Sequence, residues 1–314
     1  MPTDPQAHPV DGRLLDRLRT RLDQALPGAV ALRRALHEHP DPSGDEEGTV
    51  ARVLDALPGC SVVERVAGTG AVARVGPAGE PVAVRAELDA LPIAEATGYR
   101  HASTRPGVMH ACGHDVHLAA LVALAHAVAA EPQAPPLLAV LQPREETYPS
   151  GAQDITIDGV LARHAARAII SAHVQPLLAP GEVASTPGPV NAAADEFTIV
   201  VHGHGGHAAY PHRTRDPVLA LAHIVVALQQ IPARAVDPMA PVVLGVSTLQ
   251  AGAAANAVPE TATASGVLRT MNEEDRDHLR ERLRAVATGT AQAHECTVEV
   301  TIDSGEPVLH NHPR

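Results

Sequence analysis

The ten residues 108–117, VMHACGHDVH, concentrate side chains that bind metal ions. Cys112 and His114 are separated by one glycine, which lets the backbone bend closely and would place both side chains on one side of an extended loop. A thiolate and an imidazole suit zinc and other late first-row divalent ions. Because an isolated Cys-x-His pair is more often a coincidence or a buried thiol, a metal site needs further ligands from elsewhere in the chain.

Three apolar runs end in polar side chains that could supply those ligands. They are Glu87 and Asp89 in PVAVRAELDALP, Glu145 and Glu146 in PPLLAVLQPREE, and His173 in RAIISAHVQP. Taken singly, paired glutamates are as often solvated charge, and a histidine that closes an apolar run is as often part of the core. Three independent coincidences are harder to accept than one shared site. Of two adjacent carboxylates, one can bind metal while the other moves a proton, which is the chemistry of metal-assisted hydrolysis.

The elements that must position these groups follow from the hydrophobic pattern. Helical periodicity covers residues 12–37, and further helices are predicted at about 45–57 and 116–130. Because these helices alternate with short buried apolar runs, the sequence predicts an α/β sheet. In such sheets, ligands bind outside the carboxyl ends of the strands, where the polar residues collect.

The second part of the chain has a different order of elements. The pattern predicts strands at 196–203, 240–250, 260–271 and 296–303, with helices at 216–231 and 273–294. This β-α-β-β-α-β order is the ferredoxin-like arrangement. We therefore expect a catalytic metal-binding domain at 1–188, a lid or dimerisation domain at 189–303, and a return segment of the first domain at 304–314. The Gly- and Pro-rich stretch 177–190 would link the two domains.

Composition excludes several classes of protein. A chain of 314 residues, 45% hydrophobic, can form two domains. Only 1% of the residues are aromatic and the net charge is −12, which argues against nucleic acid as a partner. Cys60, Cys112 and Cys296 are too few and too far apart for a disulfide framework. No leader peptide is recognised, and no uninterrupted apolar run reaches the ~18 residues of a membrane span, so we expect a cytoplasmic protein without membrane association.

The motifs MHACGHDVH, QPREE, SAHVQP and GHGGHAAYPH together resemble peptidase family M20. The branch most similar to them contains the N-acyl-amino-acid amidohydrolases, including hippurate hydrolases and plant auxin-conjugate hydrolases. The resemblance runs in order through residues 32–49, 84–98 and 251–270 and covers nearly the whole chain. It implies a mixed-sheet α/β metallohydrolase domain with an inserted ferredoxin-like domain, which agrees with the arrangement predicted from the pattern.

The resemblance also implies a binuclear metal centre. Cys112 is similar to the thiolate that bridges two metal ions in this branch, and His114, Glu146 and His173 match its other ligands. The two divalent ions would be Zn, Mn, Co or Ni. They would lie about 3.5–4 Å apart, where they could clamp the carbonyl oxygen and the attacking water.

Five further residues take roles from the same resemblance. Glu145 matches the general base and acid, and Asp89 the carboxylate that orients a metal ligand. His207 matches a histidine that stabilises the tetrahedral oxyanion, often across a dimer interface. Asn256 and Arg269 match substrate-binding positions, where the amide could bind an acyl oxygen and the guanidinium a carboxylate.

Plainer interpretations of the second-domain residues remain open. His207 could belong, with His204 and His212, to a histidine-rich surface turn, and Arg269 could be a structural charge at a strand end. The family also implies a homodimer formed through the lid domain.

The sequence departs from the family pattern in two places. Glu87 stands where the branch usually has aspartate. The chain ends in SGEPVLHNHPR, just where relatives return to the first domain and supply a last metal-ligand histidine. Neither His310 nor His312 can be assigned that role, so we expect one metal to lack a ligand and some apolar surface to be uncovered.

The leading hypothesis is a metal-dependent amidohydrolase that acts on N-acyl amino acids or small amide conjugates. One alternative is a non-catalytic relative that binds metal or an acyl amino acid without turnover. Another is a dipeptidase, which the absence of a carboxylate pair for a free amino group disfavours. A purely structural zinc site fits poorly, because such sites are usually closed by four Cys or His ligands.

Overall fold

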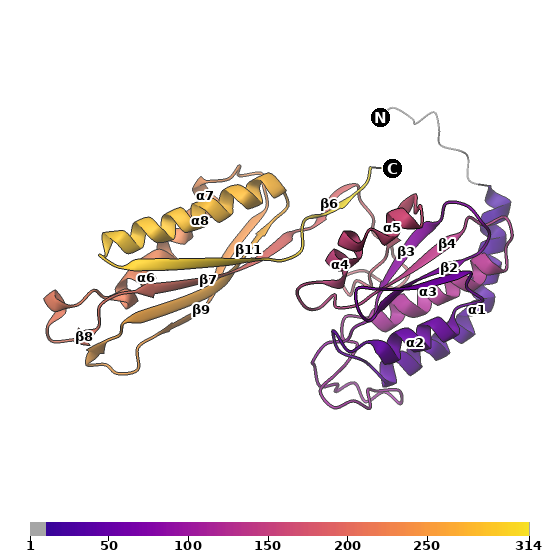
Figure 1. Cartoon of the computed structure of the whole chain (residues 1–314), viewed down its shortest axis with the longest axis horizontal. Coiled ribbons are helices and arrows are strands. Elements are labelled where there is room, and N and C mark those ends of the chain that lie inside the picture. Colours follow the sequence, from indigo (N-terminus) through magenta and orange to yellow (C-terminus); the bar gives the residue numbers. More distant parts are fainter. Residues whose placement is uncertain (1–10, 314) are drawn as a thin grey trace. The chain divides into compact units, whose positions relative to one another are not determined.

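The computed structural model describes residues 11–313, which form two compact units. The first unit ends at Gly181 and the second begins at Glu182. Each unit has its own sheet and its own covering helices (Figure 1), and each has a separate hydrophobic core.

The first unit is built on a five-stranded mixed sheet of order β1-β2-β4-β3-β5. Its strands are β1 (Val62–Val66), β2 (Gly70–Val75), β3 (Val82–Glu87), β4 (Leu137–Gln142) and β5 (Ala168–Ser171). The central strands β3 and β4 run parallel, as do β3 and β5, whereas β2 is antiparallel to both of its neighbours. Every residue of β4 is buried, which explains why its sequence is a continuous apolar run.

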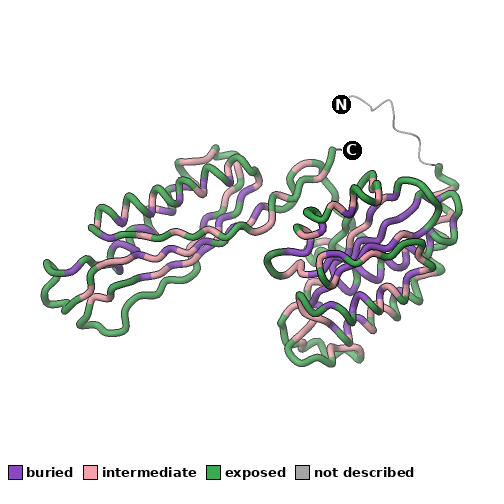
Figure 2. Tube along the Cα trace, viewed as in Figure 1, coloured by how far each residue is buried: buried purple, intermediate pink, exposed green. Residues whose placement is uncertain are grey.

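Helices cover both faces of this sheet. On one face lie α1 (Gly12–Glu38), α2 (Glu47–Ala56) and α3 (His114–Ala129), and on the other α4 (Gly151–Asp158) and α5 (Val160–Arg163). The alternation of β4 follows this division, because Ala139 and Leu141 pack in the first core while Leu138 and Val140 pack with Ile155 of α4. Purple traces in Figure 2 mark the same buried strands.

The predicted α/β sheet and its three helices are confirmed, with one consequential shift. The helix predicted at 116–130 begins at His114, with Gly113 as its N-cap. His114 is therefore the first helical residue, and the extended Cys-Gly-His loop expected from the sequence is wrong. The β1–β2 hairpin lay in a region where the sequence pattern gave no separate strand assignment.

The second unit contains a four-stranded antiparallel sheet of order β12-β7-β11-β9. Its strands are β7 (Ala193–His202), β9 (Val242–Ala251), β11 (Thr261–Thr270) and β12 (Thr297–Ser304). One face is covered by α6 (Pro217–Leu228), α7 (Gln230–Arg234) and α8 (Glu273–Ala293). The strand order and connections are those of a ferredoxin-like fold, as predicted. The helix expected at 216–231 is divided at Gln229 into α6 and α7.

Two small ribbons complete this unit. β8 (Gly206–His207) pairs with β10 (Ala257–Val258), and β6 (Gly188–Asn191) pairs with β13 (Leu309–Asn311). A 3-10 turn, η1 (Pro211–Arg213), follows β8. The segment after β12 therefore pairs with a strand of the second unit.

Residues 217–234 are long and apolar enough to resemble a membrane span by length and composition alone. One face of this segment packs against the sheet and contributes side chains to the core between the helices and the sheet. These are Ala220, Leu221, Ile224, Leu228 and Ile231. On the outer face of α6, the side chains of Leu219 and Val226 are exposed.

Candidate metal centre

The predicted ligands meet at one edge of the first sheet. β3, β4 and β5 are parallel, so the residues that follow them emerge at the same edge. Asp89 follows β3, Glu145 and Glu146 follow β4, and His173 follows β5. The first turn of α3 brings His114 to this edge.

The donor atoms lie within a few ångströms of one another. Cys112 Sγ is 3.3 Å from His173 Nε2. His114 Nε2 is 3.8 Å from Glu145 Oε2 and 3.9 Å from Glu146 Oε1. Two overlapping groups, Cys112–His114–His173 and His114–Glu145–Glu146, each have their donor atoms within 4.8 Å of one another. The fold thus collects all four predicted metal ligands and the predicted base.

Two of these atoms are buried and lack a hydrogen-bond partner among the described residues. They are His114 Nε2 and Glu146 Oε1. Buried polar atoms are normally paired, so both need a partner that the protein chain does not supply. His114 Nδ1 donates to the backbone oxygen of Asp89 at 2.8 Å, which leaves Nε2 with its lone pair free. A thiol, two imidazoles and a carboxylate around such atoms fit a divalent transition-metal ion.

Charges around His114 favour a cation at this position. Burial alone would lower the pKa of the imidazole, but hydrogen bonds with Asp89 and Cys112 and the charges of Glu87 and Cys112 outweigh it and raise the pKa to about 11. An environment that holds a proton this strongly has a negative potential. A metal ion can use the same potential when it replaces that proton.

Asp89 connects two of the predicted ligands. The carboxylate is fully buried, and its Oδ2 accepts hydrogen bonds from Ser43 Oγ at 2.6 Å and from the Glu146 backbone N–H at 2.9 Å. Its Oδ1 lies 3.5 Å from His114 Nδ1. Burial would raise the pKa of Asp89, but these hydrogen bonds lower it, so the group is an anion that can orient both ligands.

Glu145 has a different environment from its neighbour. Its side chain is 37% exposed, compared with 19% for Glu146. Burial and the negative charge of Glu146 raise the pKa of Glu145. A carboxylate with a raised pKa and access to solvent suits a group that takes up a proton and releases it again.

Glu87 and His117 take part in a contact that the sequence analysis did not assign. His117 Nδ1 lies 2.8 Å from Glu87 Oε2, and His117 Nε2 accepts the backbone N–H of Val174 at 3.0 Å. Although Glu87, His114 and His117 are close enough to hold an ion, both nitrogens of His117 are already engaged. The signal was present in the motif, since residues 114 and 117 lie on one face of a helix.

The hydrogen bond to His117 also fixes the pKa of Glu87. Burial would raise this pKa, but the contacts with His117 and with Arg85 lower it to about 2. Glu87 therefore remains charged. It holds His117 rather than a metal ion, which gives the residue that departs from the family pattern a structural role.

Gly113 shapes the turn between Cys112 and His114. Its φ is +85°, in the left-handed region that glycine adopts freely. A Cβ at this position would lie 2.5 Å from Val174 Cγ2. Glycine therefore permits both the helix start at His114 and the close approach of the segment that carries His173.

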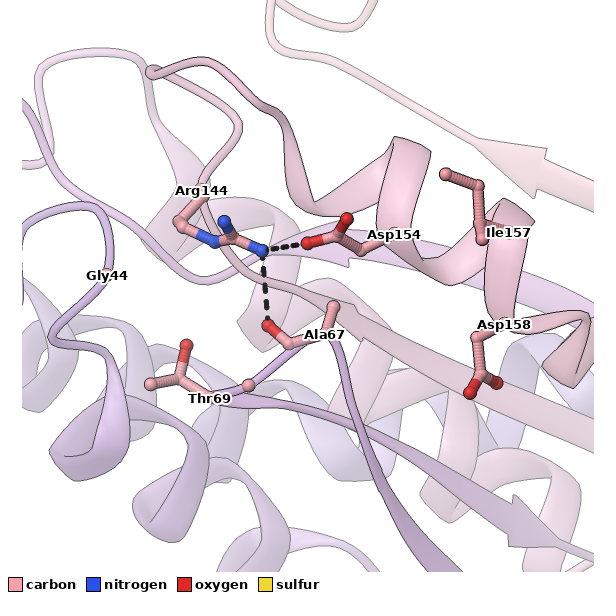
Figure 3. A pocket seen from close by; sticks show the side chains of 8 residues that line it. Gly44, Ala67, Thr69, Arg144, Asp154, Ile157 and Asp158 are labelled. Atoms are coloured by element: carbon pink, nitrogen blue, oxygen red, sulfur yellow. Dashed lines mark hydrogen bonds and ion pairs between the residues drawn. The ribbon is translucent and has the colours of Figure 1, made fainter.

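A hollow of about 690 Å³ lies beside the segment that carries the two glutamates. It is lined by Gly44, Ala67, Gly68, Thr69, Arg144, Asp154, Ile157 and Asp158. In Figure 3 the Arg144 guanidinium reaches between the Asp154 carboxylate and the backbone oxygen of Ala67. None of the predicted metal ligands lines this hollow, so it is a feature separate from the metal centre.

In the second unit, two of the three predicted site residues, the catalytic His207 and the substrate-binding Asn256, are neighbours. The backbone oxygen of Asn256 accepts the N–H of Ala208 at 3.0 Å, next to His207 in β8. His207 Nδ1 accepts the N–H of Ala209 at 3.1 Å, so the ring proton is on the exposed Nε2. His207 thus presents a hydrogen-bond donor to solvent.

Arg269 lies far from that turn within the same unit. β11 starts at Thr261, near the β8–β10 ribbon, and Arg269 is eight residues further along the strand. At roughly 3.3 Å per residue, Thr261 and Arg269 are roughly 26 Å apart along the strand. The second unit therefore does not bring Arg269 together with His207 and Asn256.

These features together define a class: a metal-dependent hydrolase with an α/β metal-binding unit and a ferredoxin-like unit. The chain belongs to peptidase family M20/M25/M40, whose model matches residues 83–314. It is an enzyme of the amidohydrolase type.

Similar proteins support this assignment. YhaA of Bacillus subtilis (strain 168) is 37% identical over 307 residues, which are 96% of this chain and 77% of YhaA. The N-acyl-L-amino acid amidohydrolase of Geobacillus stearothermophilus is 35% identical, covering 94% of this chain and 81% of that protein. The crystal structure of Bacillus subtilis YxeP, a dinuclear metal-binding peptidase of the M20 family, is 29% identical with a TM-score of 0.77. That match covers 92% of this chain and 76% of YxeP.

Proposed function

We propose that this protein hydrolyses the amide bond of N-acyl amino acids. Two buried atoms, His114 Nε2 and Glu146 Oε1, have no hydrogen-bond partner among residues 11–313 and lie close to the partly exposed Glu145 carboxylate, whose pKa is raised. This convergence carries the proposal. The likeness to an N-acyl-L-amino acid amidohydrolase over 94% of the chain supports the substrate class.

Cys112, His114, Glu146 and His173 would hold two divalent ions, and the similar YxeP is a dinuclear metal-binding peptidase. Bound ions of this kind polarise a substrate carbonyl and make a water molecule more acidic. Glu145 accepts the proton of the attacking water and returns it to the amide nitrogen as the C–N bond breaks. Asp89 keeps His114 and Glu146 in place through its buried carboxylate.

Three side chains of the second unit are the proposed groups that contact the substrate. The exposed Nε2–H of His207 can donate to the oxyanion that forms on the carbonyl, with Asn256 beside it. Arg269 can bind the carboxylate of the amino-acid part through two parallel hydrogen bonds. The division into a catalytic domain at 1–188 with 304–314 and a lid at 189–303 is part of this proposal.

A homodimer explains the distance between these substrate groups. Because His207 and Arg269 lie near opposite ends of β11, one second unit can offer them to two different sites. The exposed apolar side chains of α6, Leu219 and Val226, offer a surface for such pairing.

The test is release of free amino acid from a panel of N-acetyl, N-benzoyl and longer N-acyl amino acids. The purified chain is stripped of metal and reloaded with Zn²⁺, Mn²⁺, Co²⁺ or Ni²⁺. We expect metal-dependent release that is lost in Glu145→Ala, while Glu145→Ala retains bound metal by elemental analysis. Release that persists in Glu145→Ala would contradict the mechanism. A folded, metal-loaded chain that releases no amino acid from any conjugate would be a non-catalytic relative.

A further inference from the structure

The segment that contains Glu145 and Glu146 lies outside regular secondary structure. β4 ends at Gln142 and α4 begins at Gly151. Sheet hydrogen bonds therefore do not extend to the two glutamates. Their geometry depends on individual contacts made by the backbone on either side of Glu145.

Two buried carboxylates make those contacts. The N–H of Glu146 is bound by Asp89, and the N–H of Arg144 donates to Glu46 Oε1 at 2.9 Å. The side chain of Glu46 is fully buried. The Pro143–Arg144 and Glu145–Glu146 peptides are thus each held by a carboxylate from a distant part of the chain.

The contacts of Glu46 extend to two further loops. Its Oε1 also accepts the N–H of Gly44 at 2.8 Å, and its Oε2 accepts the hydroxyl of Thr69. Gly44 adjoins Ser43, whose hydroxyl binds Asp89. The segment 43–46 therefore contains one of the two carboxylates, Glu46, and binds the other, Asp89, through Ser43.

Arg144 needs this support because of its backbone conformation. Its φ is +49°, a left-handed value that side chains with a Cβ rarely adopt. Its carbonyl accepts the N–H of Gly151 at 3.1 Å, and its guanidinium binds Asp154 and the backbone oxygens of Ala67 and Pro149. Strained conformations persist where surrounding contacts over-determine them, and they cluster at functional sites.

We propose that Glu46 is a positioning residue for the Glu145–Glu146 pair, acting through the backbone N–H of Arg144. The inference rests on the proposed function, since it assigns Glu46 a task only if these glutamates bind metal and move a proton. Its role depends on the reach of an acceptor oxygen rather than on negative charge, because all three of its partners are hydrogen-bond donors.

Four variants distinguish a role that depends on the reach of the Glu46 acceptor oxygen from a role that depends on its negative charge. Glu46→Asp keeps the charge but shortens the side chain. Glu46→Ala removes both the charge and the acceptor oxygens. Glu46→Gln keeps the length and can still accept at Oε1 while its amide donates to Thr69 Oγ1. Thr69→Val is the matched control, because it removes a partly buried hydrogen bond to the same carboxylate without altering the bond to Arg144.

The first readout is Zn²⁺ affinity, measured by competition with a chromophoric chelator on folded protein. The visible spectrum of the Co²⁺-loaded chain gives a second signature. We expect Glu46→Asp and Glu46→Ala to bind Zn²⁺ about 10–100-fold more weakly and to alter the Co²⁺ spectrum. Glu46→Gln and Thr69→Val should stay within about threefold of the unsubstituted chain, well below that range. Where turnover is measured, kcat should fall in the first pair with little change in KM.

The outcomes are distinguishable. Zn²⁺ affinity and a Co²⁺ spectrum that are unchanged in Glu46→Asp and Glu46→Ala overturn the positioning role. A loss in Glu46→Gln equal to that in Glu46→Ala, with Glu46→Asp unaffected, overturns it in favour of a charge effect. Turnover that survives in Glu145→Ala overturns the proposed function instead, and a chain that binds no Zn²⁺ overturns both.

Discussion

His117 accepts a hydrogen bond from the backbone N–H of Val174 at 3.0 Å. This contact ties the first turn of α3 to the segment that carries His173, and Glu87 fixes the orientation of the His117 ring from the other side. Two of the proposed metal donors, His114 and His173, are thereby held in position relative to each other by His117, whose two ring nitrogens are both hydrogen-bonded.

Replacing His117 should therefore weaken metal binding. His117→Ala removes the partner of the Val174 N–H and of Glu87 Oε2, while Arg85 still binds Glu87 Oε1. We expect metal affinity to fall by about 10–100-fold, as for other residues that orient metal ligands. His126→Ala is the control, because it removes a histidine from the same helix whose ring binds only the backbone oxygen of Ala56. Equal metal affinities in the two variants, measured by chelator competition, would contradict this role.

Metal removal should destabilise the chain through Cys112. A ligand at about 100 times its Kd stabilises the folded state by about 2.7 kcal/mol, so adding a chelator should lower Tm. In Cys112→Ala, Tm should be nearly the same with chelator as with added Zn²⁺, because a central donor is missing. Cys60→Ala removes a partly buried thiol that donates a hydrogen bond to the Pro58 carbonyl, and this variant should keep the full metal-dependent shift in Tm. Differential scanning calorimetry with and without metal measures this, and a full shift in Cys112→Ala would exclude Cys112 as a ligand.

Gly113→Ala should damage the site through the backbone. The positive φ and the contact with Val174 together should cost about 1–3 kcal/mol of the free energy of unfolding, and metal affinity should fall with it. Gly289→Ala in α8 is the matched control, since a Cβ there meets nothing. In a helix interior that change should stabilise by up to about 1 kcal/mol. Urea unfolding of both variants checks the prediction, which fails if the two glycines respond alike.

The second unit should show an acid-dependent loss of stability at Asp195. This buried carboxylate accepts hydrogen bonds from Arg276 at 2.7 Å and from Arg280 at 2.6 Å. Burial alone would raise the pKa of Asp195, but the two arginines lower it. Because the folded pKa lies below the unfolded value of about 3.9, the stabilisation is present above about pH 4. It is lost as the pH falls through the folded pKa.

Asp195→Asn should accordingly destabilise the chain by about 3–5 kcal/mol near neutral pH, because the buried Arg276 and the partly buried Arg280 lose the negative charge that they share. The difference from the unsubstituted chain should shrink as the pH falls below about 4, where Asp195 itself becomes protonated. Asp303→Asn on the exposed surface of β12 should change stability by less than about 0.5 kcal/mol. Urea unfolding between neutral and acidic pH measures both, and a pH-independent difference would refute the assignment.

Much of the fold follows from local pattern. The apolar runs of β3, β4 and β5 and the helical periodicity of α1 and α8 depend on side-chain spacing, which is visible in sequence. The β-α-β-β-α-β order of the second unit is likewise a matter of element sequence. Local signals were weaker where a glycine set a helix start, as at Gly113, or where one helix was divided, as at Gln229.

The sequence by itself determined the chemistry available: a thiol, imidazoles and paired carboxylates placed after strands whose carboxyl ends share one edge. Only the tertiary structure decided which lone pairs remain free. Glu46 and Arg144 are 98 residues apart, and Asp89 and Glu146 are 57 apart, yet their hydrogen bonds hold both flanks of Glu145. His114 keeps Nε2 free because its Nδ1 binds the backbone oxygen of Asp89. In His117, Nε2 is occupied because it accepts the backbone N–H of Val174. Such contacts join distant segments and have no local periodicity, so they exist only once the sheet has assembled.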